Sequence, residues 1–137
     1  MKTLKIQTVV SVFIKNNRLL MEKRSDKKGV YPGFLMCPSG HVENGESYKQ
    51  AIQREMKEEL GIEVKKLKFL FSMDDKDTVS KKVFQHNFLR IISFKGKIKN
   101  SKESNKLIWM DYEQLKEREL VLIVERLVER LKNKKFL

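Results

Sequence analysis

The amino-acid sequence predicts an α/β fold in which a mixed β-sheet is packed against helices. Two patterns indicate this fold: a helix near the middle of the chain has strand-like segments on both sides, and a second, amphipathic helix follows near the C-terminal end. The chain has 137 residues, which is the size of one typical domain. We therefore expect residues 1–137 to form a single domain around one core.

Strand and turn signals dominate the first 46 residues. The segment 8–14 is rich in β-branched side chains and predicts a buried strand. Asn16 and Asn17 predict a turn, after which residues 18–22 form the hairpin partner of that strand. The next segments predict a loop, a short strand and a second loop, at residues 25–33, 34–37 and 38–46.

A helix with clear signals at both ends follows. Ser47 is its predicted N-cap, and Gln50 completes a capping-box pattern. Gly61 stands where a helix commonly ends on a left-handed residue. Between these ends, apolar residues recur at helical spacing and predict the side that packs on the sheet: Ala51, Ile52, Met56 and Leu60.

The second half of the chain predicts further strands and a terminal helix. Strands are expected at residues 62–73, 83–94 and 107–110, with a charged loop at 74–82. Asp111 predicts the cap of a helical turn that begins at Tyr112. The last helix is expected to bury an apolar face formed by Leu120, Ile123, Val124, Leu127, Val128 and Leu131.

The charge balance is strongly basic, with 30 Lys and Arg against 18 Asp and Glu, a formal net charge of +12. Such a balance suggests an anionic partner: nucleic acid, a membrane surface or a phosphorylated small molecule. No segment is long and apolar enough to span a membrane. The single cysteine, Cys37, excludes an intrachain disulfide and a cysteine-based zinc site. We expect a cytoplasmic protein without a membrane partner.

Three glutamates on the central helix are candidate ligands of a metal ion. Glu55, Glu58 and Glu59 stand at i, i+3 and i+4, so their side chains share one helix face. Like charges at this spacing destabilise a helix, and a divalent cation would reverse that effect. Hard oxygen donors favour Mg²⁺ or Mn²⁺ over zinc. The alternative is an ordinary exposed helix face, on which Arg54 and Glu58 form an i, i+4 ion pair.

The residues around these glutamates complete a longer motif. Residues 40–62 read GHVENGESYKQAIQREMKEELGI, and their glycine, arginine and glutamate positions match the Nudix box throughout. The chain therefore resembles the Nudix hydrolase family, in its small, single-domain, MutT-like form. This resemblance implies a Nudix-type α/β/α sandwich, in which the box forms a loop–helix–loop catalytic unit held against the mixed sheet.

The resemblance also implies roles for the residues of the box. Glu55, Glu58 and Glu59 match the carboxylates that hold the divalent metals, and the main-chain carbonyl of Gly40 matches a further ligand. Arg54 matches the arginine that orients these acidic groups by ion pairing. The cofactor implied is Mg²⁺, or Mn²⁺ in its place.

The reaction implied is hydrolysis of the diphosphate linkage in a nucleoside diphosphate derivative. With a (deoxy)nucleoside triphosphate, the products are a nucleoside monophosphate and pyrophosphate. The general base in this family is either a carboxylate of the box or a glutamate on a later loop. Glu103 matches the second kind, or else is a solvated loop acid. Glu46 matches an acidic position that is structural or lies in the outer shell of the metal site.

Contacts to the substrate are expected from basic residues ahead of the box. Lys23 and Arg24 are placed to contact a phosphate, while His41 either contacts a phosphate or packs within its loop. Sequence marks typical of Nudix enzymes that cleave ADP-ribose, diadenosine polyphosphates or NADH are absent. Their absence favours a nucleoside triphosphate as the substrate.

Several alternatives stay open beside this interpretation. The region around the start of the box also resembles the isopentenyl diphosphate isomerase branch, but Ser39 stands where that branch has its catalytic cysteine. Cys37 is two residues too early for that role and is expected to be a buried small apolar residue. Ser39 also replaces a usual glycine, and would be strained if its φ were positive. Further alternatives are a non-catalytic nucleotide-binding Nudix module, a hydrolase of RNA 5′ ends, and a homodimer.

Overall fold

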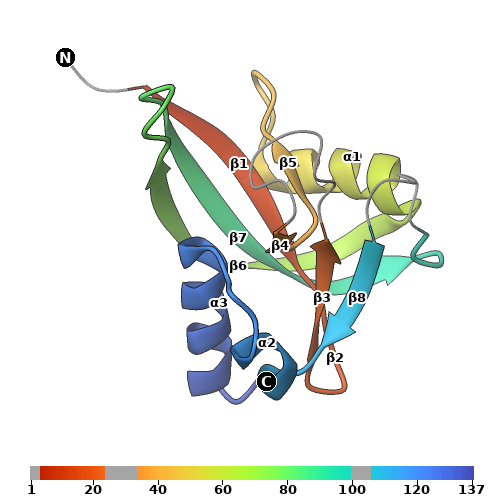
Figure 1. Cartoon of the computed structure of the whole chain (residues 1–137). Coiled ribbons are helices and arrows are strands. Elements are labelled where there is room, and N and C mark those ends of the chain that lie inside the picture. The colour runs from red at the N-terminus through yellow and green to blue at the C-terminus, as the bar shows by residue number, and fades with distance from the viewer. Residues whose placement is uncertain (1–3, 24–33, 100–105) are drawn as a thin grey trace.

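The computed structural model describes residues 4–23, 34–99 and 106–137 (Figure 1). Its main sheet has the strand order β5-β1-β7-β6. These strands span Ser39–His41 (β5), Lys5–Val12 (β1), Val83–Lys95 (β7) and Glu63–Lys76 (β6). β1 pairs parallel with β7, and the other neighbours pair antiparallel, so the sheet is mixed as expected.

Helices cover both faces of this sheet, as Figure 1 shows. α1 (Tyr48–Leu60) packs on the face that carries Val9 and Leu89, and α3 (Leu122–Asn133) packs on the face that carries Val10 and Phe88. Successive residues of a strand point to opposite faces, which is why neighbours in β1 and β7 belong to different hydrophobic clusters. The predicted α/β/α sandwich is therefore confirmed.

A smaller second sheet lies beside the main one. Its central strand is β3 (Arg18–Lys23), which pairs antiparallel with β2 (Ile14–Lys15), β4 (Leu35–Met36) and β8 (Lys106–Met110). The turn at Asn16 and Asn17 is confirmed, and both residues have positive φ. The predicted hairpin was too long, because only Ile14 and Lys15 pair with β3 and the rest of the first strand belongs to the main sheet.

The signals that bound the central helix are all confirmed. The Ser47 side chain accepts a hydrogen bond from the Gln50 N–H at 3.1 Å, and the Gln50 side chain accepts one from the Ser47 N–H. Gly61 ends α1 in the left-handed conformation, with φ 70°. The four predicted apolar residues of this helix are buried.

The C-terminal helices also follow the expected pattern, with one change. Asp111 caps α2 (Tyr112–Lys116) through a capping box with Gln114. α3 begins at Leu122, so Leu120 precedes the helix instead of opening it. Leu120 still packs against the core, and the other five predicted apolar residues of this helix are buried.

Three other predicted boundaries were wrong. β6 continues to Lys76, so the loop predicted at 74–82 is shorter, because pairing of Asp74 to Lys76 with β7 extends the strand through charged residues. The predicted loop 38–46 contains β5, which pairs with β1 and forms one edge of the main sheet. The strand predicted at 34–37 is reduced to β4. Among the described residues, no helix is long and apolar enough to cross a membrane.

Candidate active site

Arg54, in the middle of α1, is the centre of a hydrogen-bonded cluster that reaches β5. Its Nε donates to Glu46 Oε2 at 2.8 Å and one terminal nitrogen donates to Glu46 Oε1 at 2.9 Å, so the pair is bidentate. The other terminal nitrogen donates to Glu55 Oε1 at 2.7 Å. A fourth bond reaches the main-chain oxygen of His41 at 2.9 Å. One guanidinium therefore ties the helix to both β5 and the loop that follows it.

The loop acid Glu46 is held firmly in its ionised form. Besides the Arg54 pair, Glu46 Oε1 accepts a hydrogen bond from the Glu43 N–H at 2.8 Å. These contacts lower the pKa of Glu46 to about 2, with the Arg54 hydrogen bonds as the largest cause. Glu46 therefore stays charged at any physiological pH and keeps Arg54 in place. These contacts fit the structural or outer-shell role expected for Glu46.

Glu55 lies directly against the backbone of Gly40. A Cβ atom added to Gly40 would collide with the Glu55 carboxyl group, so only glycine allows this approach. The Glu55 side chain is 13% exposed. Burial raises the pKa of Glu55, and repulsion from Glu59 and Glu58 adds to the rise, while Arg54 opposes it. The structure thus concentrates negative charge beside the backbone of Gly40.

The other two glutamates continue from this cluster along the same helix. Glu58 lies 3.7 Å from Arg54 and is exposed, and Glu59 is half-buried. In the part of the chain that the structure describes, no three His, Cys, Asp or Glu side chains already form a metal-binding group. The structure therefore brings Arg54, Glu55 and Gly40 together, with Glu58 at the edge of the cluster.

The predicted substrate contacts are only partly visible. Lys23 is exposed at the end of β3, and the His41 ring lies 6.4 Å from that of Phe84, centroid to centroid. Arg24 and Glu103 lie outside the described residues. Contacts of these four residues with a substrate, and the choice of general base, stay predictions.

Cys37 is fully buried, and the pKa of its thiol is raised to about 12 by burial and by the nearby charge of Glu22. A thiol in this environment is a core group, as expected, and is unsuited to act as a nucleophile. Ser39 is not among the described residues with positive φ. The backbone strain that a positive φ would cause at this position is therefore absent.

Two buried polar groups were not singled out as site candidates from the sequence. Glu22 in β3 is 5% exposed. It stands two residues after the apolar Leu20, so the alternation of a strand would have placed it on the same inward side. Asn87 in β7 is fully buried; its side-chain nitrogen donates to the main-chain oxygen of Thr8 at 2.7 Å, and its oxygen accepts from Ser72 at 2.6 Å. Asn87 therefore links three strands of the main sheet.

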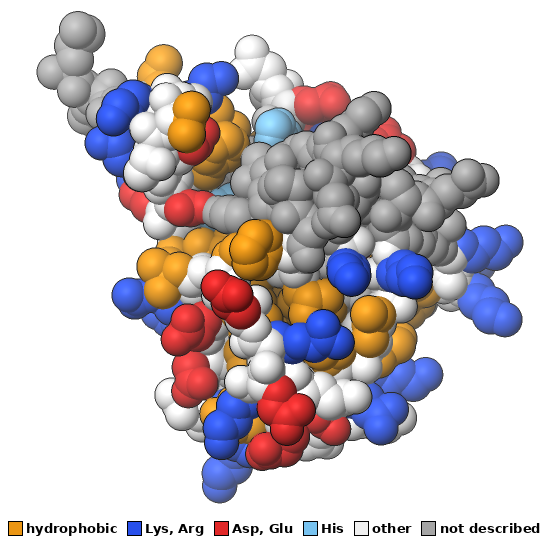
Figure 2. All heavy atoms as spheres, viewed as in Figure 1, with side chains coloured by type: hydrophobic (Ala, Val, Ile, Leu, Met, Phe, Trp, Pro, Cys, Tyr) orange, Lys and Arg blue, Asp and Glu red, His pale blue; other side chains and the backbone are white. Residues whose placement is uncertain are grey.

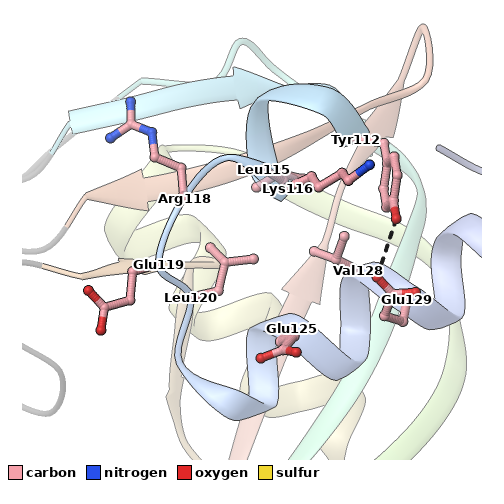
Figure 3. A pocket seen from close by; sticks show the side chains of 9 residues that line it. All are labelled: Tyr112, Leu115, Lys116, Arg118, Glu119, Leu120, Glu125, Val128 and Glu129. Carbon is pink, nitrogen blue, oxygen red and sulfur yellow. Dashed lines mark hydrogen bonds between the residues drawn. The ribbon is translucent and has the colours of Figure 1, made fainter.

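A pocket of about 330 Å³ lies elsewhere, between α2 and α3 (Figure 3). Leu115, Leu120 and Val128 give it an apolar lining, and the Tyr112 hydroxyl donates to Glu129 at 3.4 Å across one side. None of the residues that line it belongs to the segment 40–62. The pocket therefore shares no residue with the Arg54 cluster.

Comparison with solved structures shows the same fold in several proteins. A MutT Nudix hydrolase from Burkholderia pseudomallei superposes with a TM-score of 0.81 at 22% identity, covering 92% of this chain and 97% of that one. A MutT protein from Methanosarcina mazei gives 0.83 at 20% identity, covering 98% of each chain. At these identities the likeness establishes the fold.

Curated relatives match a shorter stretch. A Nudix hydrolase from Nostoc sp. is 41% identical over 59 residues, which is 41% of this chain and 35% of the relative. The nucleoside triphosphatase NudI of Escherichia coli is 41% identical over 56 residues, which is 40% of each protein. The chain therefore matches well under half the length of these relatives.

The comparison with family models covers nearly the whole chain. Residues 5–131 match the NUDIX domain. This range includes both faces of the sandwich and the complete Arg54 cluster. The chain therefore belongs to the Nudix family of hydrolases, which is the family that its sequence motif indicated.

Proposed function

We propose that this protein is a metal-dependent pyrophosphohydrolase that cleaves the diphosphate linkage of a nucleoside diphosphate derivative. The preferred substrate is a (deoxy)nucleoside triphosphate, which would yield a nucleoside monophosphate and pyrophosphate. The observation that carries this proposal is the Arg54 cluster, in which the partly buried Glu55 is held against Gly40. The name of the NudI relative, a nucleoside triphosphatase, supports the choice of substrate.

The residues present fit a divalent cation. Glu55, Glu58, Glu59 and the Gly40 carbonyl offer only hard oxygen donors, which suit Mg²⁺ or Mn²⁺. Burial of Glu55 beside two other glutamates raises its pKa, and a cation would remove the cost of this repulsion. When bound, the cation would neutralise phosphate charge and make a water molecule more acidic. We propose these four residues as its ligands.

The chain itself supplies orientation and a proton acceptor. Arg54 fixes the rotamer of Glu55 and the position of β5 through its four hydrogen bonds. In the reaction, the oxygen of water forms a bond to phosphorus, the bridging P–O bond breaks, and a carboxylate accepts the proton of the water. That carboxylate is either one of the box glutamates or Glu103.

Basic residues would receive the anionic substrate. Lys23, Arg24 and His41 are the proposed contacts to its phosphates. The net charge of +12 would raise the local concentration of a polyphosphate near the site. A reducing cytosol, where such nucleotides occur, is the proposed location and fits a chain with a single buried cysteine.

A panel of nucleoside triphosphates and nucleotide conjugates, supplied with Mg²⁺ or Mn²⁺, tests this proposal by detection of pyrophosphate or phosphate. We expect turnover of at least one triphosphate, reduced about 100-fold or more in Glu58→Gln and Glu59→Gln. Lys57→Gln is the matched control, because Lys57 is exposed in the same helical turn and should keep full activity.

Three outcomes would contradict the proposal. Full activity in both glutamine variants would remove the glutamates from the site. Absence of turnover on every nucleotide would favour a non-catalytic nucleotide-binding module. Conversion of isopentenyl diphosphate, without nucleotide hydrolysis, would favour the isomerase alternative.

A further inference from the structure

Four polar side chains form a closed ring of hydrogen bonds where α1 meets the main sheet. Gln7 lies in β1, Gln85 and Asn87 lie in β7, and Tyr48 is the first residue of α1. Gln7 Oε1 accepts from the Asn87 side-chain nitrogen at 3.0 Å and from the Tyr48 hydroxyl at 3.2 Å. Gln85 Nε2 closes the ring by donating to Asn87 Oδ1 at 3.0 Å and to the Tyr48 hydroxyl oxygen at 3.5 Å. The ring therefore joins the first turn of α1 to two strands.

Asn87 fixes the direction of the bonds in this ring. It is fully buried, its nitrogen also donates to the main-chain oxygen of Thr8, and its oxygen also accepts from Ser72. An amide with both ends bonded in this way cannot turn over without placing oxygen against oxygen. Gln7 must then present its oxygen to Asn87, which makes the Tyr48 hydroxyl the donor to Gln7. A buried network whose bonds are all satisfied is rigid, so Tyr48 is held in one position.

Tyr48 lies on the same stripe of α1 as two of the proposed metal ligands. Glu55 and Glu59 follow Tyr48 by seven and eleven residues, so both point within about 20° of its direction around the helix axis. Ala51 and Ile52 pack this helix against the sheet, but apolar contacts are not directional and restrict rotation about the axis only weakly. A hydrogen bond is directional, so the Tyr48 hydroxyl restricts this rotation. Rotation of α1 would carry the Glu55 carboxyl group away from Gly40.

Gln7 is also bonded to the segment that carries Gly40. Its main-chain oxygen accepts a hydrogen bond from the Val42 N–H at 3.0 Å. Val42 follows His41, whose main-chain oxygen accepts from Arg54 at 2.9 Å, and Gly40 precedes His41. Gln7 therefore holds the helix through its side chain and the end of β5 through its main chain. These are the two parts of the molecule whose relative position sets the distance between Glu55 and Gly40.

From these contacts we propose that Gln7 and Tyr48 are positioning residues of the metal site, with Asn87 as their buried anchor. They act through the glutamates and not on the metal itself. The ring holds α1 at the rotation that puts the Glu55 carboxyl group against Gly40, with Glu59 on the same stripe. This role rests on the metal-dependent function proposed above.

Titration with Mn²⁺ in the absence of nucleotide tests the role of the ring. Tyr48→Phe removes only the hydroxyl and keeps the ring that stacks on Phe69, with centroids 6.4 Å apart. Gln7→Leu removes the oxygen that accepts from Tyr48. Each variant should bind Mn²⁺ about 10-fold more weakly, which is the usual effect of removing a residue that orients a metal ligand. The double variant should bind only slightly more weakly than either single variant, because both changes break the same bond.

Three control variants separate positioning from general stabilisation. Gln7→Glu keeps the accepting oxygen and should keep the Mn²⁺ affinity. Ser72→Ala removes a hydrogen bond from Asn87 but leaves the ring closed, so it should lower the Tm without changing the Mn²⁺ affinity. Tyr112→Phe removes a hydroxyl that donates to Glu129 between α2 and α3, where Figure 2 shows acidic and basic side chains interspersed. It should also keep the Mn²⁺ affinity.

Circular dichroism verifies that each variant is folded, and Tyr48→Phe alone decides the matter if Gln7→Leu does not fold. Unchanged Mn²⁺ affinity in folded Tyr48→Phe would overturn the positioning role and leave the proposed metal site standing. An equal loss of affinity in Ser72→Ala would also overturn it, because the ring would then act only through stability. Absence of Mn²⁺ binding by the unaltered protein would overturn the proposed function, and the positioning role with it.

Discussion

At the scale of single residues, the candidate site depends on the missing side chain of Gly40. Gly40→Ala should remove most of the activity, because the new Cβ would force Glu55 or β5 to move. Gly45→Ala is the matched control, since a Cβ there meets no atom within 4 Å, although the φ of 81° makes alanine strained. Kinetic assays with melting curves distinguish the two. Equal activity losses in both variants would contradict a special role for Gly40.

Glu46 allows a test of the Arg54 cluster by pH. The pKa of Glu46 falls from 4.5 to about 2 in the folded protein. A lowered pKa means that the folded state binds this proton less readily than the unfolded state, so the stabilisation is present above about pH 4.5 and is lost towards pH 2. Glu46→Gln removes this contribution. The difference in Tm between the two proteins should be largest near neutral pH and shrink on acidification, and a constant difference would contradict the ion pair.

At the scale of elements, α1 is stabilised at both ends by residues that the sequence reveals. Gly61→Ala should destabilise the protein by about 1 kcal/mol, because alanine disfavours the left-handed conformation that ends the helix. Ser47→Ala should cost a similar amount through loss of the N-cap hydrogen bond. Urea denaturation measures both changes. An unchanged midpoint in either variant would show that the corresponding cap contributes nothing.

Elements with local signals were predicted well, and those that depend on distant partners were not. The caps of α1 and α2 are local signals, so Ser47, Gln50, Asp111 and Tyr112 were found from the sequence. Gln114, which completes the capping box of α2, was not. β5 was missed because three residues form a strand only when β1 lies beside them. The end of β6 was missed because charged residues join a strand when β7 continues to pair with them.

The candidate site shows the same division. The spacing of Arg54 and the glutamates was readable because a helix places residues at i, i+3 and i+4 on one face. The burial of Glu22 and the Asn87 contacts across three strands required the tertiary structure. So did the close approach of Glu55 to Gly40, which joins residues fifteen positions apart.

At the scale of the whole molecule, Cys37 reports on global opening. It is fully buried beside Met21, and its thiol has a pKa raised to about 12. Thiol reagents should therefore modify the folded protein only when the core opens, and added urea should accelerate the reaction in proportion to the unfolded fraction. Rapid labelling under native conditions, measured by mass spectrometry, would contradict the position of Cys37 in the core.

The divalent-metal site proposed at the box glutamates and Gly40 is tested most simply by direct measurement of Mn²⁺ binding. Isothermal titration without nucleotide compares the unaltered protein with the triple variant Glu55→Gln/Glu58→Gln/Glu59→Gln. Circular dichroism verifies that both are folded. We expect the unaltered protein to bind Mn²⁺ and the triple variant to lose this binding, because amides cannot supply the charge of three carboxylates. Equal Mn²⁺ affinity in the two folded proteins would contradict the claim.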